Sequence, residues 1–204
     1  MRLFYFPGSC ALAPHIALEW VGADFEAVRV AKGDADLLAV NPLGVVPALE
    51  RNGRIHTQAD AILHLIADLY PDAGLGGDGT PEGNYALNEW MAFLTGDLHP
   101  AFFPFFNTAR YTTDGSKAAL AAVKSAAQAR VAHYYEHLEA HLDGRDYLVG
   151  DGRSIADAYA IPMLRWGRLL DKPLAEYPVL NAYLERFESD AGVRKALEGQ
   201  GLKR

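Results

Sequence analysis

The first 30 residues predict a strand, a helix and a second strand, and this order limits the possible folds more than any other feature. Arg2–Phe6 is short and aromatic-rich and ends at Pro7–Gly8, which is typical of a buried strand. Ala11–Val21 has apolar residues near helical spacing and stops at Gly22, whereas Phe25–Val30 again has the pattern of a strand. Because two strands joined by a crossover helix run parallel, this segment predicts a βαβ unit.

An antiparallel half is predicted to follow. Val45–Glu50 is apolar and precedes Asn52–Gly53, the strongest short-range signal for a hairpin, and Ile55–Thr57 supplies the returning strand. Ala61–Leu69 has one apolar face and stops before Tyr70–Pro71, which indicates a helix. The N-terminal part is therefore predicted to be an α/β domain of order βαβ-ββα.

The rest of the chain shows no strand pattern. Residues 71–83 are rich in glycine and proline, which is typical of a linker, so we expect two domains, at 1–77 and 84–204. The second domain is predicted to be all-helical. Its predicted helices are Glu82–Pro100, Ser116–Leu142, Ser154–Leu170, Pro178–Ser189 and Gly192–Glu198.

Composition narrows the classes of partner. The formal net charge is -7, so the protein as a whole repels nucleic acid and anionic lipid. No apolar run approaches the roughly 20 residues that span a bilayer, and Met1–Cys10 has the pattern of a strand and not the basic start of a signal peptide. The single cysteine excludes an internal disulfide and fits a reducing compartment, so we expect a cytoplasmic protein without a bound metal.

The single cysteine lies where a strand turns into a helix. Cys10 follows Pro7–Gly8, which places its sulfur near the unsatisfied N–H groups at the start of the helix. Such a position predicts a thiol pKa below the free value of about 8.5 and a reactive thiolate. The alternative is a buried, inert cysteine, which is common for a lone thiol.

A second unusual feature is the proline at the start of the third strand. Pro47 removes a hydrogen-bond donor from the sheet, which is unfavourable unless the position has another purpose. A cis Val46–Pro47 bond is one explanation. A trans proline on an edge strand is the other, because only about 5–6% of X-Pro bonds are cis.

These features together resemble the glutathione transferases, and the bacterial beta class most closely. The motifs are Ser9-Cys10-Ala11, Val46-Pro47 and Gln58-Ala59-Asp60-Ala61-Ile62. Tyr147–Gly150 and Ser154–Asp157 resemble the C-domain signature, so the resemblance covers almost the whole chain. It implies a thioredoxin-like N-terminal domain and a helical C-terminal domain. Ser154 with Asp157 is also close to a capping box, which would start a helix.

The resemblance assigns glutathione contacts to the N-terminal domain. Cys10 matches the cysteine that lies at the glutathione sulfur and can form a mixed disulfide with it. Val46 would pair its backbone with the cysteinyl part of glutathione, next to a cis Pro47. Gln58 matches a polar residue near the γ-glutamyl group. Ala59 replaces a common serine, so one hydroxyl contact is missing and the backbone N–H at the helix start remains for the carboxylate.

His99 matches a beta-class histidine near the sulfur. It follows a stripe of apolar residues at helical spacing and lies slightly off that stripe, at the edge of the expected cleft. The alternative is a histidine that caps a helix C-terminus before Pro100. Pro100 and Ala92 stand where the beta class often has Lys and Asn, so the resemblance implies a more apolar pocket.

An aromatic cluster is the candidate wall for a second substrate. Its members could line an apolar cavity, although core or subunit-interface packing is the alternative for each one. They are Phe102, Phe103, Phe105, Phe106, Tyr111 and Trp166. Nearer the thiol, Ser9 and Tyr5 are candidates to assist Cys10, and Tyr5 could hydrogen-bond the sulfur.

The sequence thus predicts a glutathione transferase that conjugates glutathione to small hydrophobic electrophiles, with glutathione as co-substrate. The resemblance also implies a homodimer. One alternative is a glutathione-dependent thiol-disulfide oxidoreductase that uses Cys10, with glutathione as the resolving thiol because no second cysteine exists. Another is a non-catalytic binding or interaction protein, since fold alone does not determine function. The presence of both the Cys10 turn and Val46–Pro47 favours an enzyme.

Overall fold

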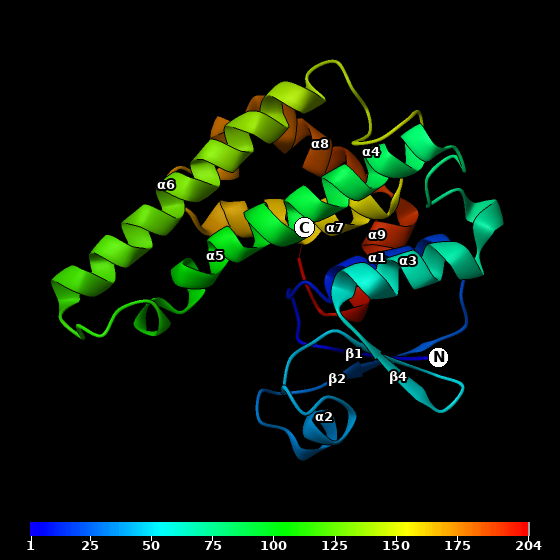
Figure 1. The fold of residues 1–204 in the computed structure, drawn as a ribbon, viewed down its shortest axis with the longest axis horizontal. Helices are drawn as coiled ribbons and strands as arrows, with labels where there is room; N and C mark the ends of the chain where they lie inside the picture. The colour runs from blue at the N-terminus through cyan, green and yellow to red at the C-terminus, as the bar shows by residue number, and fades with distance from the viewer. Residues whose placement is uncertain (204) are drawn as a thin grey trace.

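A computed structural model describes residues 1–203 and contains a small sheet at one end and a helical bundle at the other (Figure 1). The sheet has the order β2-β1-β3-β4. Its strands are β1 (Arg2–Tyr5), β2 (Glu26–Arg29), β3 (Ala48–Arg51) and β4 (Arg54–Thr57). This mixed sheet with its helices is the predicted thioredoxin-like arrangement.

The strand pairing follows the sequence prediction. β1 and β2 are parallel, with Leu3 opposite Ala27, whereas β1 and β3 are antiparallel. β3 and β4 form the predicted hairpin. Its turn residues Asn52 and Gly53 both have positive φ, 52° and 72°, which a type I′ turn requires and which Asn and Gly tolerate best. β3 starts later than predicted, after Pro47.

Helices cover both faces of the sheet. The helices α1 (Leu12–Trp20) and α3 (Ala59–Leu69) lie on the side of the bundle, and α2 (Ala35–Val40) lies on the opposite side (Figure 1). The sequence analysis did not predict α2. This helix has only six residues, too few for a clear apolar period, and its start is marked by the Asp34 side chain, which accepts a hydrogen bond from the N–H of Asp36.

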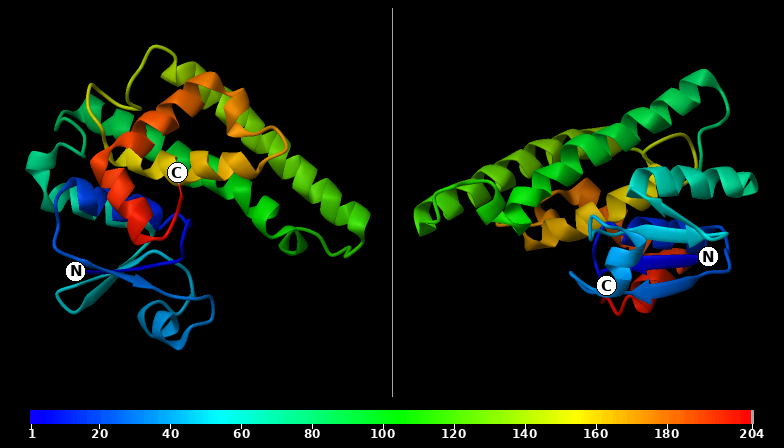
Figure 2. Two further views of the ribbon diagram at one scale, coloured as in Figure 1. Left: turned by 180° about the vertical axis from the view of Figure 1, so that it is seen from behind. Right: turned by 60° about the horizontal axis from the view of Figure 1, so that its bottom comes forward.

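The C-terminal part is helical, as predicted. A long antiparallel hairpin of helices extends away from the sheet, and the shorter C-terminal helices fold back toward it (Figures 1 and 2). The helices are α4 (Pro81–Ala92), α5 (His99–Phe106), α6 (Lys117–Leu142), α7 (Ile155–Trp166), α8 (Pro178–Ser189) and α9 (Ala191–Gly199). The capping box of Ser154 and Asp157 is present at the start of α7. None of the helices within residues 1–203 is long and apolar enough to cross a membrane.

One helix prediction needs correction. The helix expected at Glu82–Pro100 does not end there, because a π-helical segment, Phe93–Leu98, connects α4 directly to α5. A proline ring clashes with the carbonyl group four residues earlier in a regular α-helix, and the π turn lies directly before Pro100. His99 is therefore inside a continuous helical path and not at a helix C-terminus, so the capping alternative for His99 is wrong.

The two parts share a core around α1. This helix is almost completely buried and packs against α7 and α9 as well as α3. Figure 2 shows the red C-terminal helix beside the blue N-terminal segment. The turn that carries Cys10 contacts the residue directly after the last helix, because the N–H of Gly8 donates to the side chain of Gln200. The domain bounds 1–77 and 84–204 stay a prediction, and residue 204 lies outside the described residues.

Candidate active site

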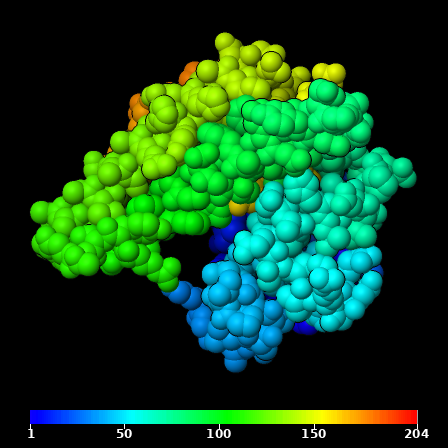
Figure 3. Space-filling view, viewed as in Figure 1, coloured from blue at the N-terminus to red at the C-terminus, as the bar shows by residue number. Residues whose placement is uncertain are grey.

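A pocket of about 440 Å³ lies between the sheet domain and the helical bundle. The space-filling view shows a hollow between the green helical hairpin and the blue N-terminal domain (Figure 3). The residues that line it are Cys10, Val45, Val46, Pro47, Gln58, Ala59, Asp60, Thr95, His99, Pro100, Phe103 and Tyr159. The pocket therefore has one wall from the starts of α1, β3 and α3, and another from the π-helical segment, α5 and α7.

The turn before α1 positions Cys10. Gly8 has φ +72°, a value that L side chains rarely adopt, so the chain can reverse after β1. The Ser9 hydroxyl donates to the Phe6 carbonyl at 2.7 Å and accepts from the N–H of Ala11 at 3.3 Å. Ser9 therefore closes the turn, and its hydroxyl holds backbone groups together.

The Cys10 sulfur lies against the cis-proline loop. Its thiol donates to the Val46 carbonyl, with 3.6 Å between sulfur and oxygen. Burial raises the pKa of the Cys10 thiol to about 12, although the N–H groups of Cys10 and Ala11 act in the opposite direction. The predicted pKa below about 8.5 is thus wrong for the structure as it stands, because desolvation outweighs the effect of the helix start.

The Val46–Pro47 bond is cis, as the resemblance implies. The preceding loop is held by the Asn41 amide, which donates to the Val45 carbonyl at 2.7 Å. Asn41 is itself buried, so the loop is fixed from within the domain. Val46 consequently presents its backbone at the edge of the pocket, beside Cys10.

The start of α3 supplies the far end of the same wall. Gln58 has φ 71°, an uncommon value for a residue other than glycine, and strain of this kind is concentrated at functional sites. No side chain caps the start of α3, so its first N–H groups are not engaged by a cap. Asp60 adds a carboxylate, whose Oδ1 is buried without a hydrogen-bond partner.

The opposite wall carries a coupled pair of side chains. His99 Nδ1 lies 2.8 Å from the hydroxyl of Tyr159. Burial lowers the pKa of His99 to about 4, so the imidazole is neutral at neutral pH, and Nδ1 can accept a hydrogen bond from the tyrosine. The remaining ring nitrogen then carries the proton. Burial, followed by the nearby charges of Cys10 and Asp60, raises the pKa of Tyr159, so its hydroxyl stays protonated.

Sequence reasoning missed Tyr159. It stands in the middle of the apolar run of α7, from Ile155 to Leu164, where its hydroxyl is one of few polar groups. A hydroxyl group in an apolar helix was the only sequence signal that could have marked Tyr159 as a site residue, and it does not show which residue the hydroxyl bonds. The partner, His99, is 60 residues away in sequence.

The aromatic candidates divide between the pocket and the core. Phe103 lines the pocket and is 43% exposed. Phe102 does not line it, because its side chain is fully buried among Phe106, Tyr135 and Trp166. Core packing, the alternative stated for this residue, is what the structure shows.

Phe106, Tyr111 and Trp166 also lie outside this pocket. Phe106 is half exposed and packs its ring on Trp166. Tyr111 lines a separate cavity of about 450 Å³ between α5 and α6. Trp166 has a different task, since its indole N–H donates to the Gly8 carbonyl at 2.8 Å and supports the turn before Cys10.

Tyr5 does not reach the thiol. Its hydroxyl donates to the Gly199 carbonyl at 3.1 Å, and its ring lies near that of His15. The strand therefore directs this side chain toward the last helix and not into the pocket, and the prediction that Tyr5 assists Cys10 has no support in this geometry.

Two family models match the chain. They are described as "Glutathione S-transferase, N-terminal domain", at residues 1–68, and "Glutathione S-transferase, C-terminal domain", at residues 94–191. The chain is 38% identical to "Glutathione S-transferase GST-4.5" of Xanthomonas campestris pv. campestris, over 99% of this chain and 100% of that protein. The chain belongs to the glutathione S-transferase family.

Solved structures agree with this assignment. A beta class glutathione S-transferase from Sphingomonas chungbukensis has a TM-score of 0.87 and 39% identity, with all of both chains covered. A sphingomonad glutathione S-transferase complexed with glutathione has a TM-score of 0.86 and 39% identity, again over both whole chains.

The chemistry available in the pocket of this transferase comes from the protein groups that line it. Within residues 1–203, no group of three or more His, Cys, Asp and Glu side chains is placed to hold a metal ion. The pocket instead combines backbone groups, one thiol, one carboxylate and the His99–Tyr159 pair. Such groups can bind a peptide, orient a sulfur nucleophile and move a proton.

Proposed function

We propose that this transferase binds glutathione along the wall formed by the sheet domain and conjugates its sulfur to a small hydrophobic electrophile held against the helices. The pocket carries this proposal, because it combines the Cys10 turn, the cis-proline loop and the start of α3 with His99 and Phe103. A family member of similar sequence is known in complex with glutathione, which supports the same ligand here.

The N-terminal wall fits an extended γ-glutamyl tripeptide. The backbone of Val46 would pair with the cysteinyl residue, as one residue of an added strand does. The side chain of Gln58 and the uncapped N–H groups of α3 would hold the γ-glutamyl carboxylate. Ala59 offers no hydroxyl, so this end of the site makes one hydrogen bond fewer than a serine would allow.

Glutathione would react as its thiolate. Its S–H proton leaves to solvent, the sulfur attacks the electrophilic carbon, and the leaving group, a halide in an aryl halide, departs with the bond electrons. The protonated nitrogen of neutral His99 and the Cys10 thiol can donate hydrogen bonds to that sulfur. Since two adjacent thiolates repel, the burial that keeps Cys10 protonated favours ionisation of glutathione.

A second activity is supported by the position of the Cys10 sulfur in the pocket wall. Cys10 could lose its proton and attack the glutathione sulfur of a mixed disulfide, which breaks that S–S bond and releases the other partner as a thiol. A second glutathione would then attack the disulfide between Cys10 and glutathione, which releases oxidised glutathione and the Cys10 thiol. Both electrons come from glutathione, so no other reductant is needed. The raised thiol pKa makes this reaction slow at neutral pH unless the bound disulfide changes the surroundings of the sulfur.

The compartment, the oligomeric state and the physiological role of the enzyme are also part of the proposal. A cytoplasmic homodimer that detoxifies apolar electrophiles follows from the family resemblance. Exposed apolar side chains on the loop that leads to the cis-proline bond, Leu43 at 74% and Val45 at 49%, support contact with a second copy of the chain. Light scattering should give twice the 22.3 kDa chain mass at micromolar concentration.

Calorimetry tests the glutathione site directly. Titration should give saturable heat with a Kd between about 1 μM and 1 mM, which corresponds to roughly -8 to -4 kcal/mol. Gln58→Ala should weaken binding and raise the KM for glutathione in conjugation of 1-chloro-2,4-dinitrobenzene. Gln128→Ala is the matched control, because Gln128 bonds Asp171 away from the pocket. Absence of heat and of conjugation in the parent protein would refute the proposal.

A further inference from the structure

We propose that Gln200, near the C-terminus, is a positioning residue that holds the Gly8 segment of the Cys10 turn in its active geometry. The kinetic part of this inference rests on the proposed function. The Gln200 side chain hydrogen-bonds Gly8 and His15, and neither these residues nor Gln200 lines the pocket, so its effect on the reaction would pass through the backbone of the turn.

Gly8 is held from two directions. Its N–H donates to Gln200 Oε1 at 3.0 Å, and its carbonyl accepts from the Trp166 indole at 2.8 Å. Both contacts come from the C-terminal part of the chain, more than 150 residues away in sequence. Two residues after Gly8 comes Cys10, so both contacts act on the segment that presents the sulfur.

The other end of the Gln200 side chain is also engaged. Gln200 is only 3% exposed, and its Nε2 lies 3.2 Å from Nδ1 of His15. Because Oε1 accepts from Gly8, the amide nitrogen must be the donor, and His15 Nδ1 must accept. Burial lowers the pKa of His15 to about 4, so the imidazole stays neutral and able to accept. His15 thereby fixes which end of the amide faces Gly8.

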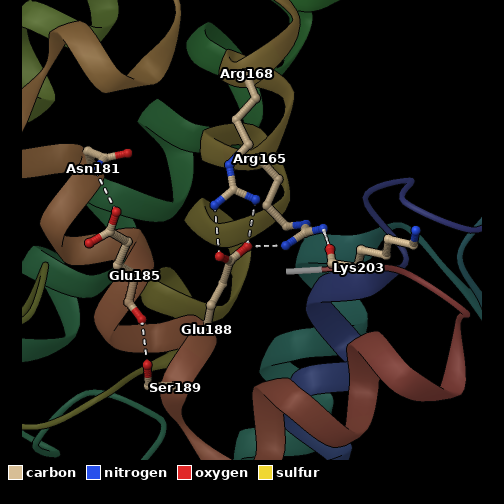
Figure 4. Close-up of polar contacts among 7 residues, drawn as sticks. All are labelled: Arg165, Arg168, Asn181, Glu185, Glu188, Ser189 and Lys203. Atoms are coloured by element: carbon tan, nitrogen blue, oxygen red, sulfur yellow. Dashed lines mark hydrogen bonds and ion pairs between the residues drawn. The ribbon is translucent and has the colours of Figure 1, made fainter.

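The segment that carries Gln200 has anchors of its own. The Tyr5 hydroxyl donates to the Gly199 carbonyl, and Arg165 donates to the Lys203 carbonyl at 2.6 Å. Figure 4 shows Arg165 between Lys203 and Glu188. These contacts hold the backbone on both sides of Gln200 without involving its side chain.

A charged cluster supports this anchor. Arg168 donates two hydrogen bonds to the Glu188 carboxylate, at 2.9 and 2.8 Å, and Arg165 binds the same carboxylate (Figure 4). Glu188 is only 4% exposed, and the guanidinium groups of Arg165 and Arg168 balance its buried charge. Substitution of Gln200 should therefore release the Gly8 N–H and leave the C-terminal segment in place.

Gln200→Met isolates the role of the amide, because methionine has nearly the same length and cannot hydrogen-bond the Gly8 N–H. We expect kcat for conjugation of 1-chloro-2,4-dinitrobenzene to fall about tenfold while KM for glutathione changes less than about twofold, since an unpaired buried N–H favours other geometries of the turn. The side-chain hydrogen bonds of Gln200 go to Gly8 and His15 and not to Val46 or Gln58, which would bind glutathione. Gln200→Glu keeps an acceptor for the Gly8 N–H, while His15 Nδ1 must then carry a proton and donate it to the carboxylate, so kcat should stay closer to the parent value than in Gln200→Met.

A second readout does not depend on catalysis. Cys10 is the only cysteine, so its alkylation by iodoacetamide can be followed by intact mass. A loosened turn exposes the sulfur, and Gln200→Met should therefore be alkylated about fivefold faster than the parent. If the parent shows no conjugation but this acceleration appears, the proposed function fails and the role of Gln200 stands.

Trp20→Phe is the matched control. It removes a 2.7 Å hydrogen bond from the Trp20 indole to Asp190, at the same contact between α1 and the C-terminal helices, without touching Gly8. Its stability should fall while kcat and alkylation stay at parent values. If Gln200→Met behaves the same way, Gln200 only stabilises the fold and the inference is wrong. If Gln200→Met does not fold, Gln200→Asn, whose amide is one methylene too short, replaces it under the same criteria.

Discussion

The two walls of the pocket are built in different ways. The wall from the sheet domain presents mainly backbone groups, at the Cys10 turn, the Val46–Pro47 bond and the start of α3. The wall from the helices presents side chains, chiefly His99, Phe103 and Tyr159. Backbone groups are fixed by local conformation, whereas the side chains meet only because α5 and α7 pack together.

This difference suggests a division of tasks. A wall of fixed backbone donors and acceptors suits a constant ligand, and glutathione is the same in every reaction of the enzyme. A wall of side chains can change by substitution without loss of that ligand, which suits a variable electrophile. The two walls can therefore be separated by experiment, because substitutions in one should affect one substrate more than the other.

Cys10→Ala should produce the largest effect. Thiol-disulfide exchange with a glutathione mixed disulfide should fall at least about 100-fold, since the nucleophile is removed. Conjugation of an aryl halide should stay within about threefold, because glutathione supplies the reacting sulfur and His99 and backbone N–H groups remain. Both reactions are measured on one preparation beside the parent.

Cys10→Ser controls for loss of packing at the same position. If conjugation collapses together with exchange in the alanine variant, Cys10 is the common catalytic group and the walls do not divide the tasks. If exchange persists, the nucleophile lies elsewhere.

Acid should destabilise the protein through two buried histidines, His15 in α1 on the sheet-domain side and His99 in α5 on the helical side. Burial lowers the pKa of both His15 and His99 from 6.5 to about 4. The unfolded chain takes up protons below about pH 6.5 while the folded chain does not, so the free energy of unfolding falls as pH falls from about 6.5 to 4. For His15, which is 2% exposed, the loss approaches about 3 kcal/mol.

Urea unfolding at pH 7 and pH 4.5 measures this loss. His15→Gln should be less stable than the parent at pH 7 but lose less stability on acidification, because glutamine does not titrate. His99→Gln should likewise show a weaker dependence of the unfolding free energy on pH than the parent. An unchanged dependence on pH in both variants would mean that other groups cause the acid sensitivity.

The sequence predicted the backbone wall well because its signals are local. Asn52–Gly53 in a hairpin turn constrains the chain within a few residues, and the predicted hairpin is present in the structure. At Val46–Pro47 the residues alone left cis and trans open, and the cis bond that the structure shows was implied by the family resemblance. The pKa of Cys10 was predicted in the wrong direction, since burial of the sulfur depends on residues far along the chain. The helix start was visible in the sequence and the desolvation was not.

The side-chain wall was predicted poorly for the same reason. Phe102 and Trp166 were grouped with Phe103 as candidate pocket residues, yet only Phe103 lines the pocket. Residues 102 and 103 point in different directions on one helix, and the choice between core and pocket depends on where α6 and α7 pack. Tyr159 could not be assigned because its partner, His99, comes from another helix.

Tyr159→Phe tests the side-chain wall. Loss of the hydroxyl removes the 2.8 Å hydrogen bond to His99 Nδ1, so the imidazole can exchange tautomers and rotate. We expect kcat for conjugation to fall about fivefold, while KM for glutathione changes less than about twofold. Tyr134→Phe is the control, because its hydroxyl bonds the exposed Arg130 outside the pocket. A rise in glutathione KM without loss of kcat would place Tyr159 with the glutathione wall instead.

Ala59→Ser tests the backbone wall with the smallest expected effect, and in the direction of gain. Ala59 lines the pocket at the first position of α3, where an added hydroxyl could donate to the γ-glutamyl carboxylate beside the helix N–H groups. One such hydrogen bond at a partly exposed site contributes about 0.5–1 kcal/mol, so KM for glutathione should fall about two- to fivefold with kcat unchanged. Ala61→Ser adds the same hydroxyl in the same helical turn but outside the pocket, and it should leave KM unaltered. If both variants lower KM equally, the gain comes from α3 itself. If neither does, the carboxylate of glutathione is not held at the start of α3, and the backbone wall ends at Val46.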